Sequence, residues 1–421
     1  MNQEKLTFIR QNAPCYIYDR QRIIENCLEL KRAIPEAVFL YSLKTNPFPP
    51  VAEAIAKQGF GADAASAQEV LLAHSLGIPR ELIYYSAPGK TEQDIEKTWD
   101  KCTVIADSLH ELQLLEKFAV VQYSVPQYPT AQPAQPSPIR VGLRINPAFS
   151  MDGAEASPSK FGIDEELLTA SALDFPHLQI CGIHVHLRSQ ILDADTLCAY
   201  YRNCCALAER LDKLPSCDIS FINFGSGIGT VYDASCEKPL ELEKISRTLQ
   251  ELRQRNPRPK FILETGRFLT CCAGKYYTRV ADIKESHSKT YVVVQNALNG
   301  FLRPAIAELL RQNLGEFPAS GCEPLYTSAH QSSFRVIRAD GDCGNCADCG
   351  NGEGSPASRK ACERVDLVGN LCTPLDVLAR DIDLPHIEIG DIVEVSNAGS
   401  YGHTLTPQLF SSQEPAKEFL L

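Results

Sequence analysis

Val38-Phe39-Leu40-Tyr41-Ser42-Leu43-Lys44 is an apolar run that ends at a lysine. Its length and its β-branched and aromatic content are typical of a buried strand. A strand of this kind would carry Lys44 to the mouth of a barrel, where an amine in an apolar pocket can form a Schiff base with an aldehyde. Pyridoxal phosphate (PLP) is the commonest cofactor that offers an aldehyde. Most lysines that follow a strand are instead solvated loop residues, so further evidence is needed.

Seven further apolar runs follow between residues 35 and 270, and most of them are separated by stretches with helical periodicity. Eight alternating strands and helices predict an α/β fold of the (β/α)8 TIM-barrel type. In this fold the C-terminal ends of the strands carry the chemistry. Each run ends at a polar or glycine-bearing residue, which in chain order are Lys44, Asp63, Ser86, Asp107, Asn146, His186, Gly225 and Glu264.

The length of the chain, 421 residues, predicts more than one domain, and 44% hydrophobic content is enough for two cores. After the barrel, strand-like runs divided by Gly and Pro predict a mainly β domain. We assign residues 20–272 to a PLP-binding barrel and 273–421 to a C-terminal β domain, which the N-terminal strand within 1–19 is expected to join. A Pro-rich insertion is predicted at 126–138 and a Cys- and Gly-rich insertion at 338–364.

The composition predicts a cytoplasmic protein whose main partner is a small molecule. A formal net charge of -11, with no block of Lys or Arg, argues against nucleic acid or an anionic membrane as partner. The N-terminus shows no leader pattern, and no apolar run approaches the roughly 20 residues of a spanning helix. Most of the 17 cysteines stand singly in apolar segments, which predicts reduced thiols.

A glycine-rich turn follows the seventh predicted strand, at Phe224-Gly225-Ser226-Gly227-Ile228-Gly229. Backbone N–H groups of such a turn can close on a phosphate, and barrels of this type often bind phosphate after strands seven and eight. Strand eight ends at Glu264-Thr265-Gly266-Arg267, which adds a guanidinium for the same phosphate. The alternative is that Glu264 and Arg267 form only a local ion pair.

Two histidines close the sixth predicted strand, and strand alternation turns both His184 and His186 into the barrel. One of them could lie flat on a cofactor ring; a hydrogen-bonded core pair and two metal ligands are the alternatives. A carboxylate such as Glu264 at a pyridine nitrogen would keep the ring protonated and favour decarboxylation or transamination. Alanine racemases share the barrel but place an arginine there, so Glu264 argues against a racemase.

The chain resembles the fold-type III PLP decarboxylases, the group of diaminopimelate and ornithine decarboxylases. The resemblance extends almost from end to end and rests on matches that occur in order: Tyr41-Ser42-Leu43-Lys44-Thr45-Asn46, Gly61-Ala62-Asp63, Leu143-Arg144-Ile145-Asn146-Pro147, Ser159-Lys160-Phe161-Gly162, His184-Val185-His186 with Ser189-Gln190, Gly225-Ser226-Gly227, Glu264-Thr265-Gly266-Arg267, Leu371-Cys372 and Ala398-Gly399-Ser400-Tyr401-Gly402.

The resemblance implies PLP as cofactor, an alanine-racemase-like barrel and a homodimer with shared active sites. It implies that Lys44 binds the cofactor covalently, that His186 stacks on its ring and that Glu264 faces its nitrogen. Cys372 would be the acid that returns a proton to the substrate carbon. Further cofactor-binding residues are implied around the phosphate and the lysine: Asp63, Ser189, Gly225, Ser226, Gly227, Gly266, Arg267 and Tyr401.

Departures from the family pattern affect the substrate end. Diaminopimelate decarboxylases typically follow the cysteine with a glutamate, whereas Thr373 follows Cys372 here, and the tyrosine expected four residues after Arg303 is Ala307. Arg303 can bind a remote carboxylate, unless it is a surface arginine at a helix start. With Thr373 and Asp376 as the other substrate-binding candidates, the pattern resembles the branch that acts on conjugated amino acids.

We therefore rank a citrate-linked diaminopropionate, a siderophore precursor, first among substrates. Carrier-protein-bound aminoacyl groups come second, and diaminopimelate third. A protein of another class, which binds PLP without catalysis, would lack the C-terminal domain that carries Cys372 and Tyr401.

Cys343, Cys346 and Cys349 form a C-x2-C-x2-C run, with Cys362 further on. Such spacing can bind zinc or an iron–sulfur cluster. The usual zinc module keeps its two cysteine pairs further apart, so a loop with redox-prone thiols is the alternative that we prefer to a metal site.

Overall fold

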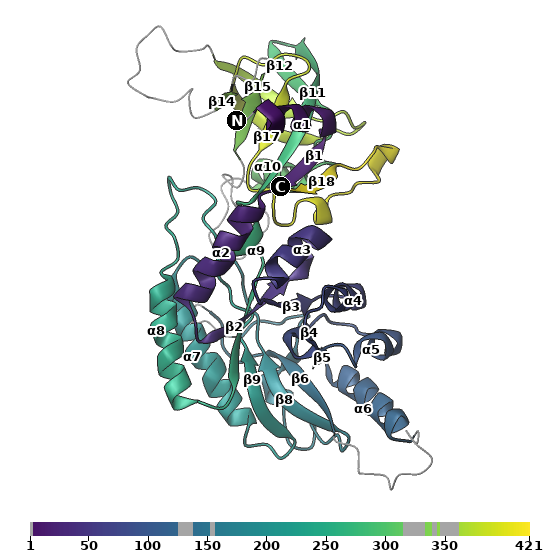
Figure 1. Ribbon diagram of the computed structural model, residues 1–421, viewed down its shortest axis with the longest axis vertical. Coiled ribbons are helices and arrows are strands. Elements are labelled where there is room, and N and C mark those ends of the chain that lie inside the picture. The colour runs from purple at the N-terminus through teal and green to yellow at the C-terminus, as the bar shows by residue number, and fades with distance from the viewer. Residues whose placement is uncertain (1–2, 125–137, 152–155, 315–332, 339–342, 346–361) are drawn as a thin grey trace. The chain divides into compact units, whose positions relative to one another are not determined.

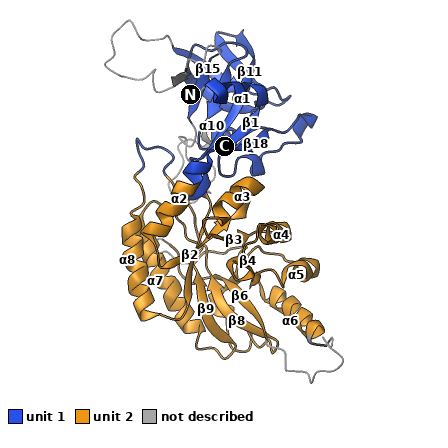
Figure 2. Ribbon diagram, in the orientation of Figure 1, with its two compact units in different colours: residues 1–23, 231–237, 267–421 blue, residues 24–230, 238–266 orange. Residues whose placement is uncertain are grey.

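The computed structural model describes residues 3–124, 138–151, 156–314, 333–338, 343–345 and 362–421 (Figure 1). The chain forms two compact units (Figure 2). The barrel unit contains residues 24–230 and 238–266, and the β unit contains residues 1–23, 231–237 and 267–421. Most of the predicted insertions at 126–138 and 338–364 falls outside the described residues; residues 338, 343–345 and 362–364 of the second are described.

The barrel unit contains eight parallel strands that close on themselves, which confirms the predicted barrel. Their order is β5-β4-β3-β2-β10-β9-β8-β6, and β5 pairs with β6 to complete the ring. The short β7 (Ile163–Asp164) extends β6 outside the ring. The eight strands are β2 (Ala37–Ser42), β3 (Gly61–Ala64), β4 (Ile83–Tyr85), β5 (Thr103–Ala106), β6 (Ile139–Asn146), β8 (Leu178–His184), β9 (Cys217–Asn223) and β10 (Lys260–Thr265).

Helices alternate with these strands and cover the outside of the barrel (Figure 1). Local sequence explains where several begin: Ser66 caps one helix through the backbone N–H of Glu69, and Thr91 with Asp94 forms a capping box at the next. The helices are α2 (Arg20–Ala33), α3 (Pro49–Ala56), α4 (Ala67–Ser75), α5 (Glu92–Thr98), α6 (Leu109–Ser124), α7 (Ala194–Leu211) and α8 (Leu242–Arg255).

Large side chains fill the barrel interior, and small residues make room for them. Phe221 projects inward from β9 against Tyr84, with ring centroids 5.2 Å apart. Gly182 on the neighbouring strand allows this packing, because a Cβ at this position would lie only 2.5 Å from the Phe221 ring. The interior is therefore a packed core, which leaves the chemistry to the strand ends.

The β unit is built on a nine-stranded sheet that the N-terminal strand joins. β1 pairs antiparallel with β11, with Cys15 opposite Tyr277, and parallel with β18. Leu6 and Ile9 of α1 pack on this sheet. The elements are α1 (Gln3–Asn12), β1 (Cys15–Tyr18), α9 (Arg267–Thr270), β11 (Gly274–Ser286), β12 (Lys289–Val294), α10 (Leu302–Leu314), β13 (Phe334–Ile337), β14 (Cys343–Asn345), β15 (Cys362–Val368), β16 (Val377–Pro385), β17 (Ile392–Val395) and β18 (Lys417–Leu420).

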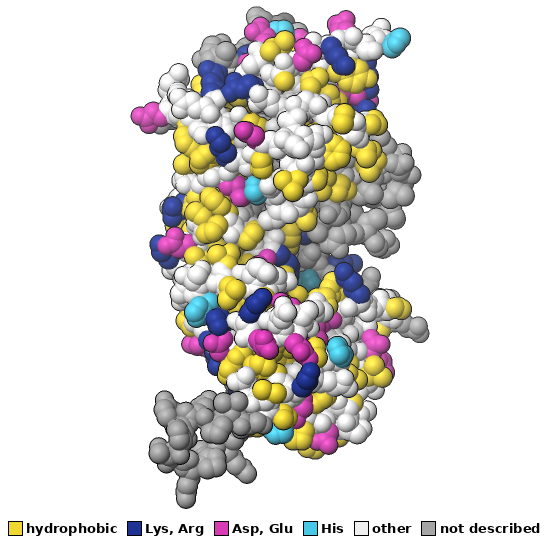
Figure 3. Space-filling view, turned by 90° about the vertical axis from the view of Figure 1, so that its right-hand side faces the viewer, with side chains coloured by type: hydrophobic (Ala, Val, Ile, Leu, Met, Phe, Trp, Pro, Cys, Tyr) yellow, Lys and Arg dark blue, Asp and Glu magenta, His cyan; other side chains and the backbone are white. Residues whose placement is uncertain are grey.

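The distribution of charge on the surface bears on the predicted partners. On the face shown in Figure 3, acidic and basic side chains are interspersed. None of the described helices is both long and apolar enough to cross a membrane.

Twelve of the described cysteines are free thiols. Cys362 differs from the predicted reduced state, since it is disulfide-bonded.

Candidate active site

Lys44 lies at the C-terminal mouth of the barrel, on a single helical turn at Leu43–Thr45 directly after β2. Its Nζ lies 3.1 Å from Oδ2 of Asp63, the last residue but one of the neighbouring strand β3. The side chain of Asp63 is fully buried, whereas that of Lys44 is 45% exposed. The buried carboxylate therefore holds an accessible amine in one place, as a covalent cofactor site requires.

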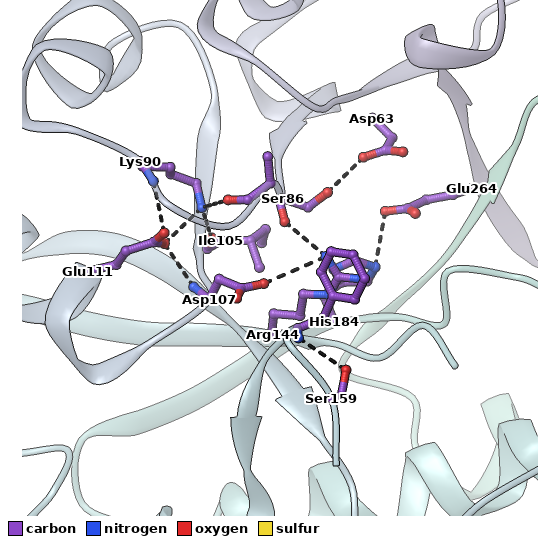
Figure 4. Close-up of polar contacts among 12 residues, drawn as sticks. Asp63, Ser86, Lys90, Ile105, Asp107, Glu111, Arg144, Ser159, His184 and Glu264 are labelled. Carbon is purple, nitrogen blue, oxygen red and sulfur yellow. Dashed lines mark hydrogen bonds and ion pairs between the residues drawn. The ribbon is translucent and has the colours of Figure 1, made fainter. Parts of the chain in front are cut away.

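A chain of polar contacts leads from Asp63 around the barrel mouth (Figure 4). Ser86 Oγ donates to Asp63 Oδ1 at 2.8 Å, and Ser86 O accepts from Arg144 Nη1 at 3.3 Å. The same guanidinium nitrogen lies 3.6 Å from Oδ1 of Asp107. Beyond it, Glu111 accepts from the backbone N–H of Asp107. These buried contacts restrict where the Asp63 carboxylate can move.

Glu264, at the end of β10, is held by two buried neighbours. Its Oε1 accepts from Asn223 Nδ2 at 2.7 Å and lies 3.4 Å from His184 Nε2. Burial alone would raise the pKa of Glu264, but the neighbouring His184 and Lys44 hold its pKa below the ordinary value. Glu264 is therefore an ionised carboxylate at neutral pH, directed by Asn223.

His186 follows β8 and presents a neutral ring to the same mouth. Burial lowers its pKa to about 3, although the nearby Glu264 opposes this shift. Its Nδ1 is buried and has no hydrogen-bond partner among the described residues. A neutral, flat imidazole without a partner suits contact with an aromatic ring.

The glycine-rich turn after β9 has a backbone that side chains would disturb. Gly225 and Gly227 have φ values of 65° and 75°, which glycine adopts without strain. A Cβ at Gly225 would collide with the His186 ring, and one at Gly266 would collide with Thr45. Ser226 Oγ donates to the carbonyl of Glu264, which ties the turn to β10. The backbone of the turn therefore packs closely on its neighbours, and a backbone without side chains at these positions is the kind that can approach an anion through its N–H groups.

Ser189, a predicted phosphate residue, lies in the loop after β8 that faces this turn. Its neighbour Gln190 bonds to the backbone of Thr230 through both ends of its amide. The backbone N–H of Ile191 also donates to Gly227 O at 2.9 Å. The loop of Ser189 and the glycine turn are thus locked together within the barrel unit.

Arg267 opens α9 in the β unit and meets two tyrosines there. Its Nη1 donates to Tyr232 Oη at 3.1 Å, and its guanidinium carbon lies 5.0 Å from the centre of the Tyr401 ring. Arg267 is 6% exposed. Two predicted phosphate residues, Arg267 and Tyr401, are therefore brought together, and Tyr232 joins them.

Arg303, near the start of α10, is 1% exposed and so is not the surface arginine of the alternative interpretation. Its Nη2 donates to the backbone carbonyl of Asn397, and its Nη1 lies 3.5 Å from Tyr232 Oη. Its guanidinium carbon lies 5.1 Å from the centre of the Phe301 ring. Nε is buried and lacks a partner among the described residues. The guanidinium is oriented and incompletely satisfied.

Cys372 and the two neighbouring candidates lie in the loop between β15 and β16. Cys372 is exposed, with Sγ 3.9 Å from Ser411 Oγ. Thr373 Oγ1 accepts from the backbone of Leu375. Asp376 is directed away from solvent: its carboxylate accepts backbone N–H groups of Leu298 and Leu371. Each carboxylate oxygen of Asp376 thus has a backbone donor, and its contact with substrate stays a prediction.

Three residues of this geometry were not singled out by the sequence. Asn223 is the last residue of β9, and Arg144 lies inside β6. Arg144, rather than the predicted strand-end Asn146, bonds to Ser86 at the barrel mouth. Asn146 instead bonds to Asp164 at 2.7 Å. Tyr232 follows the glycine turn. Strand alternation could have indicated that Asn223 and Arg144 point into the barrel. No local pattern marks Tyr232, because its partners are distant in the sequence.

The proposed metal cysteines lie mostly beyond what the structure describes. Cys346 and Cys349 fall outside the described residues, and only the backbone of Cys343 is described. Among the described residues, no group of three or more His, Cys, Asp or Glu is arranged to hold a metal ion. His184 Nε2 lies at ion-pair distance, 3.4 Å, from Glu264 Oε1, and neither of its ring nitrogens has a hydrogen-bond partner among the described residues.

The barrel residues fit PLP. The glycine turn, where a Cβ would intrude, suits a phosphate, and Lys44 lies beside a buried carboxylate. The orphaned Nδ1 of His186 and the ionised Glu264 are suited to the ring and to its nitrogen.

Comparisons with known proteins agree with this fit. Residues 20–271 match the family model described as pyridoxal-dependent decarboxylase, pyridoxal binding domain. The L-glutamyl-[BtrI acyl-carrier protein] decarboxylase of Niallia circulans is 28% identical over 100% of this chain and 92% of its own length. The diaminopimelate decarboxylase of Aquifex aeolicus is 27% identical over 93% and 83%. The crystal structure of diaminopimelate decarboxylase from Helicobacter pylori with L-lysine shares the fold, with a TM-score of 0.78, 24% identity and coverage of 100% and 94%.

Proposed function

Since the chain belongs to the family of pyridoxal-dependent decarboxylases, and so is a PLP-dependent carboxy-lyase for amino-acid substrates, we propose that its own substrate is an amino-acid conjugate with a remote carboxylate. A citrate-linked diaminopropionate, a siderophore intermediate, is the first candidate. The observation that carries the proposal is Arg303, whose guanidinium is buried, oriented and incompletely satisfied. Such a cation favours a carboxylate ligand, which it can bind with two hydrogen bonds.

The residue that follows Cys372 supports the same class of substrate. Thr373 carries no charge, so it offers nothing to a distal ammonium group of the kind that free diaminopimelate, lysine or ornithine presents. A site that leaves a substrate charge unpaired discriminates against that substrate by several kcal/mol. Free diaminopimelate, lysine and ornithine should therefore be poor substrates.

In this proposal the barrel residues bind and orient the cofactor. When bound, PLP supplies an electron-withdrawing ring that accepts the electron pair released as carbon dioxide leaves. Lys44 would hold the aldehyde carbon, with Asp63 as its buried counter-charge. His186 would contact the ring face as a neutral imidazole, and Glu264 would hold a proton at the ring nitrogen.

The remaining roles concern the phosphate and the proton. Ser189, Gly225 to Gly227, Gly266, Arg267 and Tyr401 would surround the phosphate. As the bond from Cα to the carboxylate breaks, carbon dioxide leaves without the electron pair, and Cα must then gain one proton in place of the carboxylate. Cys372 would donate that proton from its thiol and regain it from solvent, so atoms and charge balance.

We also infer a homodimer in which the β unit of one subunit completes the site of the other. The exposure of Cys372 within its own chain is compatible with this arrangement, because a catalytic thiol has to reach a substrate. The dimer is an inference from the family resemblance, and its test is given in the Discussion.

A carrier-protein-bound aminoacyl group is the second candidate substrate. The carrier-protein glutamyl decarboxylase of Niallia circulans aligns with all of this chain, although it is 28% identical. Diaminopimelate, which appears in the names of several other relatives, is the third candidate substrate.

Release of carbon dioxide from a panel of substrates tests the proposal. The panel contains the citrate-linked conjugate, an L-glutamyl carrier protein, diaminopimelate, lysine and ornithine, and kcat/KM for the conjugate should be highest. Higher activity on the carrier-bound group would establish the second candidate, and preference for diaminopimelate would refute the proposal.

Variants of Arg303 test its role in the same assay. Arg303→Ala should raise KM for the conjugate about tenfold or more while the PLP absorbance is unchanged, because a lost charged hydrogen bond is worth about 1.5–3 kcal/mol. Arg303→Lys keeps the charge of this buried residue and should lie in between. Arg364→Ala, at an exposed arginine on β15, is the control. An unchanged kcat/KM in Arg303→Ala would eliminate the proposed contact.

A further inference from the structure

The carboxylate of Asp376 links two loops of the β unit by their backbones. Its Oδ1 accepts the N–H of Leu298 at 2.7 Å, and its Oδ2 accepts the N–H of Leu371 at 2.8 Å. The side chain is 3% exposed. A charged acceptor with two backbone donors in a buried setting makes strong, directional hydrogen bonds.

The two linked loops carry the two β-unit residues of the proposed chemistry. Leu371 immediately precedes Cys372, the proposed proton donor. Leu298 lies in the turn before α10, where Phe301 donates to Ala297 O, and Arg303 follows at the start of that helix. A single carboxylate therefore connects the backbone next to the thiol with the backbone that leads to the guanidinium.

The loop of Cys372 is closed on itself around the same aspartate. The backbone N–H of Gly369 donates to Asp376 O at 2.9 Å, and that of Asp376 donates to Thr373 O at 3.3 Å. Gly369 has no room for a side chain, because a Cβ there would collide with the Asp376 carboxylate. The loop from 369 to 376 is thus packed on the buried carboxylate, while Cys372 is exposed.

The geometry points to Asp376 as a positioning residue that sets where Cys372 stands relative to Arg303. This inference rests on the proposed function, in which Cys372 donates the proton and Arg303 holds the remote carboxylate. Asp376 touches neither substrate nor cofactor and acts only through the backbone of the two loops. Misplacing a catalytic group by about 1 Å can cost about a hundredfold in rate, so the constraint matters.

Asp376→Asn is the first test, because asparagine keeps the size but turns an N–H group toward a backbone donor. We expect kcat for decarboxylation to fall about tenfold or more, with PLP absorbance retained. The alkylation rate of Cys372 by iodoacetamide, followed by peptide mass spectrometry, should change about threefold or more. The exposed Cys236 and Cys272 in the same protein are internal references and should not change. Asp383→Asn, at an exposed aspartate on β16, the strand that follows the loop of Cys372, is the matched control.

Asp376→Glu keeps the charge and shifts the carboxylate by one methylene. It should fold and give smaller changes in the same direction. Positioning is overturned if Asp376→Asn matches Asp383→Asn in kcat and in the alkylation of Cys372. It is also overturned if KM alone rises, since that result would make Asp376 a direct substrate ligand. If neither Asp376→Asn nor Asp376→Glu folds, the residue serves folding and the inference fails.

The alkylation experiment needs no substrate, which separates this inference from the proposed function. If no substrate of the panel is turned over by the unaltered protein, the proposed substrate fails, and the thiol reactivity still decides whether Asp376 positions Cys372. If the panel is turned over and the thiol reactivity is unaffected, only the positioning role fails.

Discussion

Replacing Glu264 with alanine should separate cofactor binding from turnover. The carboxylate meets Asn223 Nδ2 at 2.7 Å and His184 Nε2 at 3.4 Å, but the proposed phosphate contacts come from other residues. PLP should therefore still bind. Turnover should fall about 10²–10³-fold, the usual cost of losing one preorganised electrostatic contact to the reacting system.

The same variant should lose stability in a way that the structure specifies. Removal of the carboxylate leaves the buried amide of Asn223 without its acceptor, which costs about 1–3 kcal/mol of unfolding free energy. Glu264→Gln keeps an acceptor for Asn223 and removes only the charge. It should recover most of the stability and little of the turnover, so the two effects can be measured apart.

The assay measures carbon dioxide released per bound PLP, with bound PLP taken from its absorbance after gel filtration. Glu116→Ala is a suitable control, because Glu116 pairs with His177 on the barrel but does not face its mouth. If Glu264→Ala loses the cofactor yet keeps a normal rate per bound PLP, Glu264 is a structural residue and the reasoning is refuted.

Three further predictions follow from the other residues of the barrel and of the cysteine loop. The purified protein should be yellow and Lys44→Ala colourless, and borohydride should fix PLP to Lys44; labelling of any other lysine would contradict the assignment. Inactive Lys44→Ala mixed with inactive Cys372→Ala should regain partial activity if sites are shared between subunits, and no recovery after verified subunit exchange would count against sharing. Burial lowers the pKa of His186 to about 3, so below about pH 6.5 the unfolded chain binds a proton on this residue that the folded chain does not bind. The free energy of unfolding should therefore decline from about pH 6.5 toward pH 3. In urea titrations, His186→Phe should make this decline less steep. An identical slope in the two proteins would mean that other groups cause it.

Much of the fold could be predicted because its signals are local. The eight buried strands are short apolar runs, and the residues that end them, such as Lys44 and Glu264, stand where strand periodicity places them. The glycine-rich turn after β9 could be predicted in the same way, from local sequence. Glycine is required there because only a backbone without Cβ tolerates the φ values and close contacts of this turn.

The sequence alone determined the barrel and the cofactor, and it predicted the lysine, since strand ends in a barrel converge whatever their separation along the chain. Only the tertiary structure decided what each side chain meets. Tyr232 joins Arg267 and Arg303 across long sequence separations, and Asp376 turned out to bond to the backbone of Leu298 and Leu371. Such partners are set by packing and by the need to satisfy buried polar groups, and neither is recorded in the spacing of residues along the chain.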